Sequence, residues 1–218
     1  MTEPSREPER CCFDDWAGYS YERARKRGAA ARVTAGLLEA LGQAGLEGRS
    51  VLDVGCGVGD LATETIRLGA EWATGLDVSS ENIALARRLA AERGVADRTR
   101  FEVGNGVIAD LPAADVVVLN RVVCCYPDAD GLVDRSLAAT GSVYALTAPV
   151  SSGPVGVLNR VQTAVWNVVY AIRKRRYGGF RTFVHDMARL DERIRAAGFR
   201  PVRRERRRLV WDLAVYAR

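Results

Sequence analysis

The chain has 218 residues, of which 48% are hydrophobic and 27% are charged. These proportions exclude a disordered chain, and the length suits one domain with a small appendage. The formal net charge of +5 permits an anionic partner without requiring one. The opening segment MTEPSREPER is polar and the sequence has no apolar run of about 18 residues. We therefore expect no secretory signal, no membrane-spanning helix and a cytoplasmic location.

The five cysteines predict reduced thiols rather than a metal or disulfide framework. They are Cys11, Cys12, Cys56, Cys124 and Cys125. Four of them lie in adjacent pairs, no C-x-x-C spacing occurs, and His185 is the single histidine. Neighbouring cysteines on a strand point to opposite faces and are poor joint ligands for one ion. We expect no metal site.

The first part of the chain predicts a disordered lead over residues 1–12 and two N-terminal cap helices over residues 13–47. Strands and helices then alternate. The expected strands span residues 50–54, 72–76, 100–103, 115–119 and 142–147. The expected helices span residues 60–68, 80–93 and 127–139. This alternation predicts a doubly wound, mostly parallel sheet, with residues 50–148 as its ligand-binding core.

The alternation stops after Pro149. Residues 154–177 predict one long helix with an apolar side, within a helical lid insertion that spans residues 150–182. Residues 183–218 predict a helix over 184–197 and then two strands. The last strand is apolar and belongs inside the sheet. The expected architecture is a single α/β domain over residues 13–218 with a seven-stranded sheet.

The main chemical signal is the segment VLDVGCGVGD, residues 51–60, in which a strand runs into a glycine turn that opens a helix. Glycines at 55, 57 and 59 remove Cβ atoms where a ligand touches backbone. A dinucleotide fingerprint needs glycine at position 60, but Asp60 stands there and occupies the place of a pyrophosphate. Asp53 adds a negative charge that suits a cationic ligand group. The turn therefore predicts a ligand other than a dinucleotide.

Three further signals follow the next strands. Asp77 in GLDVS, residues 75–79, lies where a carboxylate accepts hydrogen bonds from ribose hydroxyls. Asn105 in GNG, residues 104–106, offers a donor and an acceptor to an adenine edge. The segment NRVVCCYPD, residues 120–128, follows the fourth strand, where we expect the reacting groups to meet.

These motifs, in this order, resemble those of the class I S-adenosylmethionine-dependent methyltransferases. The resemblance covers roughly residues 13–218 and is most specific over 50–148. The segments NRVVCCYPD, FRTFVH and AGFRPVRRE are similar to bacterial small-molecule methyltransferases, including the magnesium-protoporphyrin O-methyltransferase branch. The resemblance implies S-adenosyl-L-methionine as the cofactor.

The resemblance also implies roles for individual residues. The implied cofactor-binding residues are Asp53, Gly55, Cys56, Gly57, Asp77, Val78, Asn105, Gly106, Asn120 and Arg121. Among them, Asp53 faces the methionine ammonium, Asp77 holds the ribose and Val78 packs on adenine. Arg121 departs from the aromatic residue or histidine that is common at its position in the family.

Methyl transfer from a sulfonium is an in-line displacement, so most of the catalysis can come from orientation. His185 and Tyr126 are the candidate catalytic residues, and His185 has the pKa range of a general base. The candidate acceptor-binding residues are Tyr19, Tyr21 and Arg181. A cap or surface role for His185, and core or surface packing for the tyrosines, are the alternatives.

The predicted helix over 154–177 has three interpretations. It covers the acceptor site and favours a large, flat or apolar small molecule, or it packs on its own domain, or it packs on a second copy in a homo-oligomer. The basic residues 173–176 that follow it also permit peripheral contact with an anionic membrane.

The basic run over residues 203–208 permits an RNA substrate, but a strand splits these charges between two faces, which favours a solvated edge and no nucleic-acid partner. We predict transfer to a small molecule in specialised metabolism. The alternatives are an RNA methyltransferase and an enzyme that binds the cofactor but catalyses a cyclisation or elimination.

Overall fold

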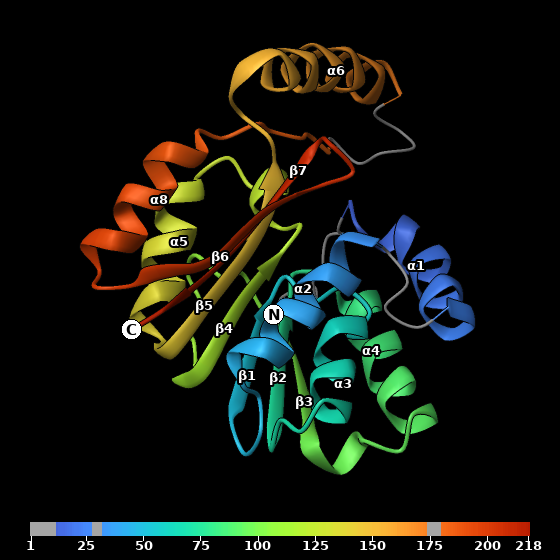
Figure 1. The fold of residues 1–218 in the computed structure, drawn as a ribbon. Coiled ribbons are helices and arrows are strands. Elements are labelled where there is room, and N and C mark those ends of the chain that lie inside the picture. The colour runs from blue at the N-terminus through green and yellow to red at the C-terminus, as the bar shows by residue number, and fades with distance from the viewer. Residues whose placement is uncertain (1–11, 28–31, 174–179) are drawn as a thin grey trace, which may run out of the picture.

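The computed structural model describes residues 12–27, 32–173 and 180–218 (Figure 1). Most of the predicted lead, Cys11 and the basic residues 174–176 lie outside the described residues. The helices are α1 (Asp14–Arg27), α2 (Arg32–Ala44), α3 (Asp60–Arg67), α4 (Ser80–Glu92), α5 (Ala129–Ala138), α6 (Gly153–Ile172) and α8 (Met187–Ala196). The strands are β1 (Ser50–Val54), β2 (Trp72–Asp77), β3 (Thr99–Val103), β4 (Ala114–Asn120), β5 (Thr140–Pro149), β6 (Arg200–Arg207) and β7 (Trp211–Ala217). Two short 3₁₀ turns are η1 (Ala96–Arg98) and η2 (Val123–Cys125).

The seven strands form one mixed sheet in the order β3-β2-β1-β4-β5-β7-β6. The first five strands in this order are parallel to one another. Strand β7 is antiparallel to both of its neighbours, β5 and β6. The predicted doubly wound α/β fold is thus confirmed, with its final apolar strand inside the sheet. The strand order reverses between β1 and β4, which is where ligands bind in open sheets of this kind.

Helices cover both faces of the sheet (Figure 1). One buried layer joins α2, α3 and α4 to the sheet and includes Leu41, Ile66 and Ile83. The other joins α5 and α8 to the opposite face and includes Leu146 and Ile194. Both layers continue to the strands next to the switch point, so the backbone there is held from both sides.

Several element ends differ from the expected ones because of capping. Helix α5 begins at Ala129, since the Asp128 carboxylate accepts a hydrogen bond from the Gly131 N–H at 2.9 Å. Helix α8 begins at Met187, since the Asp186 carboxylate accepts from the Ala188 N–H at 2.9 Å. Such side chains satisfy N–H groups that the first turn of a helix leaves unbonded.

Helix α6 lies beyond the carboxyl end of β5, apart from the two helical layers (Figure 1). Its apolar side is exposed, with Val161 at 57% and Ile172 at 79%. This contradicts the expectation that the apolar side covers an acceptor site. The helix contacts the rest of the chain through Asn159 and Asn167, which lie on its other side and hydrogen-bond to backbone groups.

Candidate functional site

The glycine turn after β1 is held against the end of β2. The N–H groups of Gly55 and Cys56 both donate to the Leu76 carbonyl, at 2.7 and 3.0 Å. Gly55 has φ +76°, and a Cβ there would lie 2.4 Å from the Val122 side chain, so only glycine fits. Gly57 has φ +54° and faces open space where a Cβ would stand. The turn therefore presents bare backbone to that space.

That space is a cavity of about 270 Å³ at the carboxyl ends of β1, β2 and β4. Its volume is at the lower end of the range for small-molecule sites. The predicted residues that line it are Gly55, Gly57, Asp77, Val78, Asn105, Gly106, Arg121 and Tyr126. Further lining residues that the sequence did not indicate include Phe13, Ser20, Asn82, Val122, Cys125 and Leu132.

Asp77 lies at the end of β2 and is 8% exposed. Its Oδ2 accepts a hydrogen bond from the Gly57 N–H at 2.8 Å. Its Oδ1 accepts from the Ser79 N–H at 2.9 Å and from the Asn82 amide at 3.2 Å. A carboxylate has about four acceptor positions, so Oδ2 retains one for a ligand. These bonds also fix the carboxylate at the cavity wall.

Asp53 is buried on β1 and does not line the cavity. Its side chain is 1% exposed, and its Oδ1 has no hydrogen-bond partner among the described residues. Burial, together with the nearby carboxylates of Asp77 and Asp60, raises the pKa of Asp53 to about 8. At neutral pH this carboxyl group is therefore mostly protonated. A buried carboxyl group with an unpaired oxygen beside a glycine turn suits a cationic group on a ligand.

Tyr126 and Asn105 meet at the cavity wall. The Asn105 amide donates to the Tyr126 hydroxyl at 3.3 Å, and its Oδ1 accepts from the Val107 N–H at 3.0 Å. His185 does not line the cavity. Its Nε2 is 2.9 Å from the Tyr126 carbonyl. Because a carbonyl only accepts, this nitrogen is the donor, and Nδ1 is the nitrogen able to take up a proton.

Arg121 follows β4 in a left-handed backbone conformation, with φ +61°. Its N–H donates to the Thr147 hydroxyl at 2.9 Å, and its guanidinium lies 5.5 Å from the Trp211 ring centroid. A non-glycine residue with positive φ at a cavity wall is typical of functional sites. The thiols of Cys124 and Cys125 lie 3.7 Å apart in the turn that follows.

Three predicted cofactor or acceptor residues are packed elsewhere. Burial raises the pKa of the Cys56 thiol, which is close to Gly75 in the core, so only the Cys56 backbone belongs to the turn. The Asn120 side chain bonds to the hydroxyls of Thr34 and Thr147, joining α2 to the sheet. Tyr21 is 3% exposed and its hydroxyl donates to Glu92 at 2.5 Å, which corrects its expected acceptor role.

Two other predicted acceptor residues, Tyr19 and Arg181, are exposed and do not line the cavity. In the segment before α8, the neighbour of Arg181, Phe180, instead packs against Phe13, which lines the cavity. The ring centroids of Phe180 and Phe13 are 5.3 Å apart, edge to face. Helix α1 is placed here by a bond from the Ser79 hydroxyl to Asp14, a contact between distant segments that no local pattern indicates.

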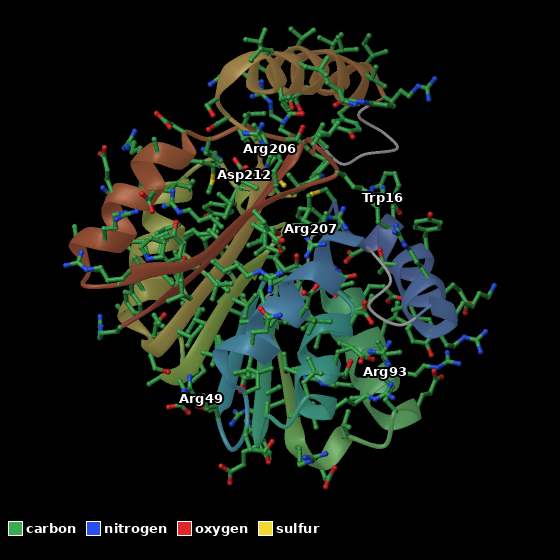
Figure 2. All side chains as sticks on the ribbon, in the orientation of Figure 1. Trp16, Arg49, Arg93, Arg206, Arg207 and Asp212 are labelled. Atoms are coloured by element: carbon green, nitrogen blue, oxygen red, sulfur yellow. The ribbon has the colours of Figure 1, made fainter. Side chains whose placement is uncertain are left out.

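A second hollow, of about 560 Å³, lies between β6, β7 and the starts of α6 and α8. Arg206 and Asp212 stand there, 3.7 Å apart (Figure 2). This larger hollow has no glycine turn and is away from the strand-order reversal. The smaller cavity combines both features with a buried carboxylate, so we assign it as the functional site.

Comparisons with known proteins show which domain the chain resembles. A family model described as a methyltransferase domain matches residues 51–139. Ribosomal protein L11 methyltransferase of Pasteurella multocida is 42% identical over 88 residues, which is 40% of this chain and 30% of that protein. The relative from Haemophilus influenzae strain PittEE gives the same identity and coverage. The chain thus spans about 30% of the length of these curated relatives.

Solved structures share the fold over most of the chain. Magnesium protoporphyrin IX methyltransferase (ChlM) from Synechocystis PCC 6803, with bound SAH, is 18% identical, with a TM-score of 0.70 and coverage of 94% of this chain and 96% of that one. The [4+2]-cyclase SpnF is 17% identical, with a TM-score of 0.72 and coverage of 94% and 93%. Residues 51–139 therefore match a methyltransferase domain, and the solved structures confirm the predicted Rossmann-like α/β fold over most of the chain.

Proposed function

We propose that this protein transfers a methyl group from S-adenosylmethionine to a small-molecule acceptor. The observation that carries the proposal is the cavity at the strand-order reversal, which is lined by the bare Gly57 turn and the fixed Asp77 carboxylate. The buried Asp53 lies on β1, the strand that leads into this turn. A ribose, an adenine and an ammonium group each find a matching residue type within this one site.

The residues present fit this cofactor. Asp77 has a free acceptor position for a ribose hydroxyl, and Val78, which is 39% exposed at the wall, offers an apolar surface to adenine. The unpaired oxygen of Asp53 suits the methionine ammonium, directly or through water. Gly57 leaves room for close approach to its backbone. Asn105 is available at the edge of the same wall.

When bound, S-adenosylmethionine supplies an electrophilic methyl group on a positively charged sulfur. The task of the chain is to hold that group in line with the acceptor atom, and such orientation can contribute about 7–11 kcal/mol to lowering the barrier. Charge is dispersed in this displacement, so the site needs no strong oxyanion hole. The rigid turn at Gly55, pinned to β2, provides the required positioning.

The acceptor side of the cavity is partly apolar and is lined by Phe13, Val122 and Tyr126. This lining favours an organic small molecule with an apolar or aromatic part. His185 does not line the cavity, so a role for it as general base would require a group that relays the proton between its ring and the acceptor. Tyr126 itself is the proposed residue in contact with the acceptor.

The basic run on β6 gives little support to an RNA acceptor. Arg203 pairs with Glu39 at 3.2 Å, Arg207 pairs with Glu205 at 2.8 Å, and Arg204 pairs with Asp191. These acids offset the positive charge along the edge strand. The match to the L11 methyltransferases covers 40% of this chain, so it supports the methyltransferase domain rather than a ribosomal acceptor.

The test is a transfer assay with candidate small-molecule acceptors, in which S-adenosylhomocysteine and the mass of the product are measured. We expect a product heavier by one methylene group for each transfer. Asp77→Ala should remove turnover, whereas Asp97→Ala, at an exposed position on η1, should retain it. Equal turnover in the two variants would contradict the role of Asp77.

A second candidate is an enzyme that binds the same cofactor but catalyses a cyclisation or elimination. The fold similarity to the [4+2]-cyclase SpnF, with a TM-score of 0.72, is the reason to assay for cyclisation as well as for methyl transfer. Conversion of an acceptor without a mass increase and without S-adenosylhomocysteine would support this candidate against methyl transfer.

A further inference from the structure

Helix α6 is amphipathic, and its apolar side faces outward. The exposed apolar residues recur at intervals that place them on one side of the helix. This apolar stripe consists of Val157, Leu158, Val161, Val165, Val168 and Ile172, each between 57% and 79% exposed. Figure 2 shows side chains of α6 projecting away from the sheet. Exposed apolar residues gathered in this way indicate an interaction surface.

The polar side of α6 holds the helix in this orientation. Asn159 is 6% exposed, and its amide donates to the carbonyls of Val150 at 2.9 Å and Val210 at 3.1 Å. Asn167 donates to the Thr182 carbonyl and accepts from the Thr182 N–H, each at 2.9 Å. Turning the apolar stripe inward would break all of these bonds and leave buried polar groups unpaired. The outward orientation is therefore part of the fold.

The segment that carries the apolar stripe has charges of one sign. The sequence contains no aspartate or glutamate from residue 150 to residue 185. The described basic residues of this segment are Arg160, Arg173 and Arg181, and all three are exposed. An apolar stripe with cationic neighbours is complementary to a bilayer whose headgroups are anionic.

We propose that α6 binds the surface of an anionic lipid bilayer, with the apolar stripe inserted at the level of the headgroups and the helix lying in the membrane plane. Within the described parts of the chain, no helix has the length and apolar content needed to cross a bilayer. Trp166 is outside the stripe, on the side of α6 that carries Asn159, and its ring stacks on Tyr170 with the ring centroids 5.9 Å apart.

The same charges disfavour a second copy of the chain as the occupant. In a two-fold symmetric contact the same surface meets itself, so the cationic residues beside each apolar stripe would approach those of the other copy. Such like-charge contacts oppose association of two copies. An anionic bilayer, in contrast, attracts the basic residues and accepts the apolar stripe.

The experiment is vesicle co-sedimentation of the full chain with phosphatidylcholine vesicles, with and without phosphatidylglycerol, at low and high salt. We expect binding to the anionic vesicles that weakens at high salt. Val161→Glu/Val165→Glu and the uncharged Val161→Ser/Val165→Ser should each lower the vesicle partition coefficient about tenfold or more. Val202→Glu, at a 58% exposed position on β6, is the matched control and should bind as wild type.

Two further readouts separate the possible occupants. Brominated lipids should quench tryptophan fluorescence more strongly in Val165→Trp, which places an indole ring in the stripe, than in wild type. Circular dichroism should show equal folded content in all variants, since the substituted side chains are exposed. Absence of binding to anionic vesicles, equal binding of the stripe variants, or a concentration-dependent dimer that the stripe substitutions dissociate would overturn the proposal.

Discussion

Replacing Asp53 with asparagine tests the electrostatics of the site. Asparagine keeps the shape of the protonated carboxyl group but cannot ionise. In the folded protein, burial raises the pKa of Asp53 from an ordinary value of 3.8 to about 8. Between these two pH values the unfolded chain has released the proton and the folded chain retains it. Folding stability must therefore fall as pH rises through this window.

The size of the effect follows from the width of the pH interval. Each pH unit within the window costs about 1.36 kcal/mol, so raising pH from about 5 to about 8 lowers the free energy of unfolding by about 4 kcal/mol through Asp53 alone. Asp53→Asn removes this contribution. The difference in stability between variant and wild type should grow by that amount across the interval, whatever the constant effect of the substitution.

The assay is urea unfolding of wild type and Asp53→Asn at intervals between about pH 5 and pH 8, without ligand. Subtracting the two curves cancels the titration of groups that both proteins share. Asp97→Asn, an exposed position on η1, serves as the control and should give a difference that does not change with pH. A flat difference for Asp53→Asn as well would refute the conclusion that Asp53 is protonated in the folded protein.

Three other predictions follow from the same geometry. Binding of S-adenosylmethionine should release a proton from Asp53 at neutral pH, because the positively charged ammonium group favours the ionised carboxylate. Calorimetry in buffers of different ionisation enthalpy should detect this release, and Asp53→Asn should abolish it. Gly57→Ala should weaken cofactor binding more than tenfold and lower the free energy of unfolding by about 1–2 kcal/mol. Gly55→Ala should lower the free energy of unfolding further, because its Cβ would collide with the Val122 side chain. Binding titrations and urea unfolding of both variants measure these two effects separately. Arg93→Ala should lower the free energy of unfolding by about 3 kcal/mol, because this residue is 11% exposed and pairs with Asp60 at 2.8 Å (Figure 2); an unchanged melting temperature would refute that role.

The sheet was predictable from the sequence because its signals are local. The glycine turn at residues 55–59, the N-cap at Ser79 and the continuous apolar run before Asn120 each mark an element boundary within a few residues. Asp77 and Gly57 were also predictable as cavity residues, because the carboxyl ends of neighbouring parallel strands meet at one edge.

Other parts of the site depend on contacts between distant segments. The helical pattern around Tyr21 does not indicate which way its ring points. In the structure the ring packs between α1 and α4, and its hydroxyl donates a hydrogen bond to Glu92. Phe13 reaches the cavity because α1 packs on α4 and is bonded to Ser79. The periodicity of α6 showed that one side is apolar, but the direction of that side was decided by the hydrogen bonds of Asn159.

The cavity beside Gly57 and Asp77 is the proposed binding site of S-adenosylmethionine. Equilibrium dialysis of the folded full chain with radiolabelled S-adenosylmethionine tests it most directly. We expect saturable uptake of one molecule per chain, with a large loss of affinity in Asp77→Ala and none in Asp97→Ala. Absence of uptake by folded wild-type protein, or equal affinity in Asp77→Ala, would contradict it.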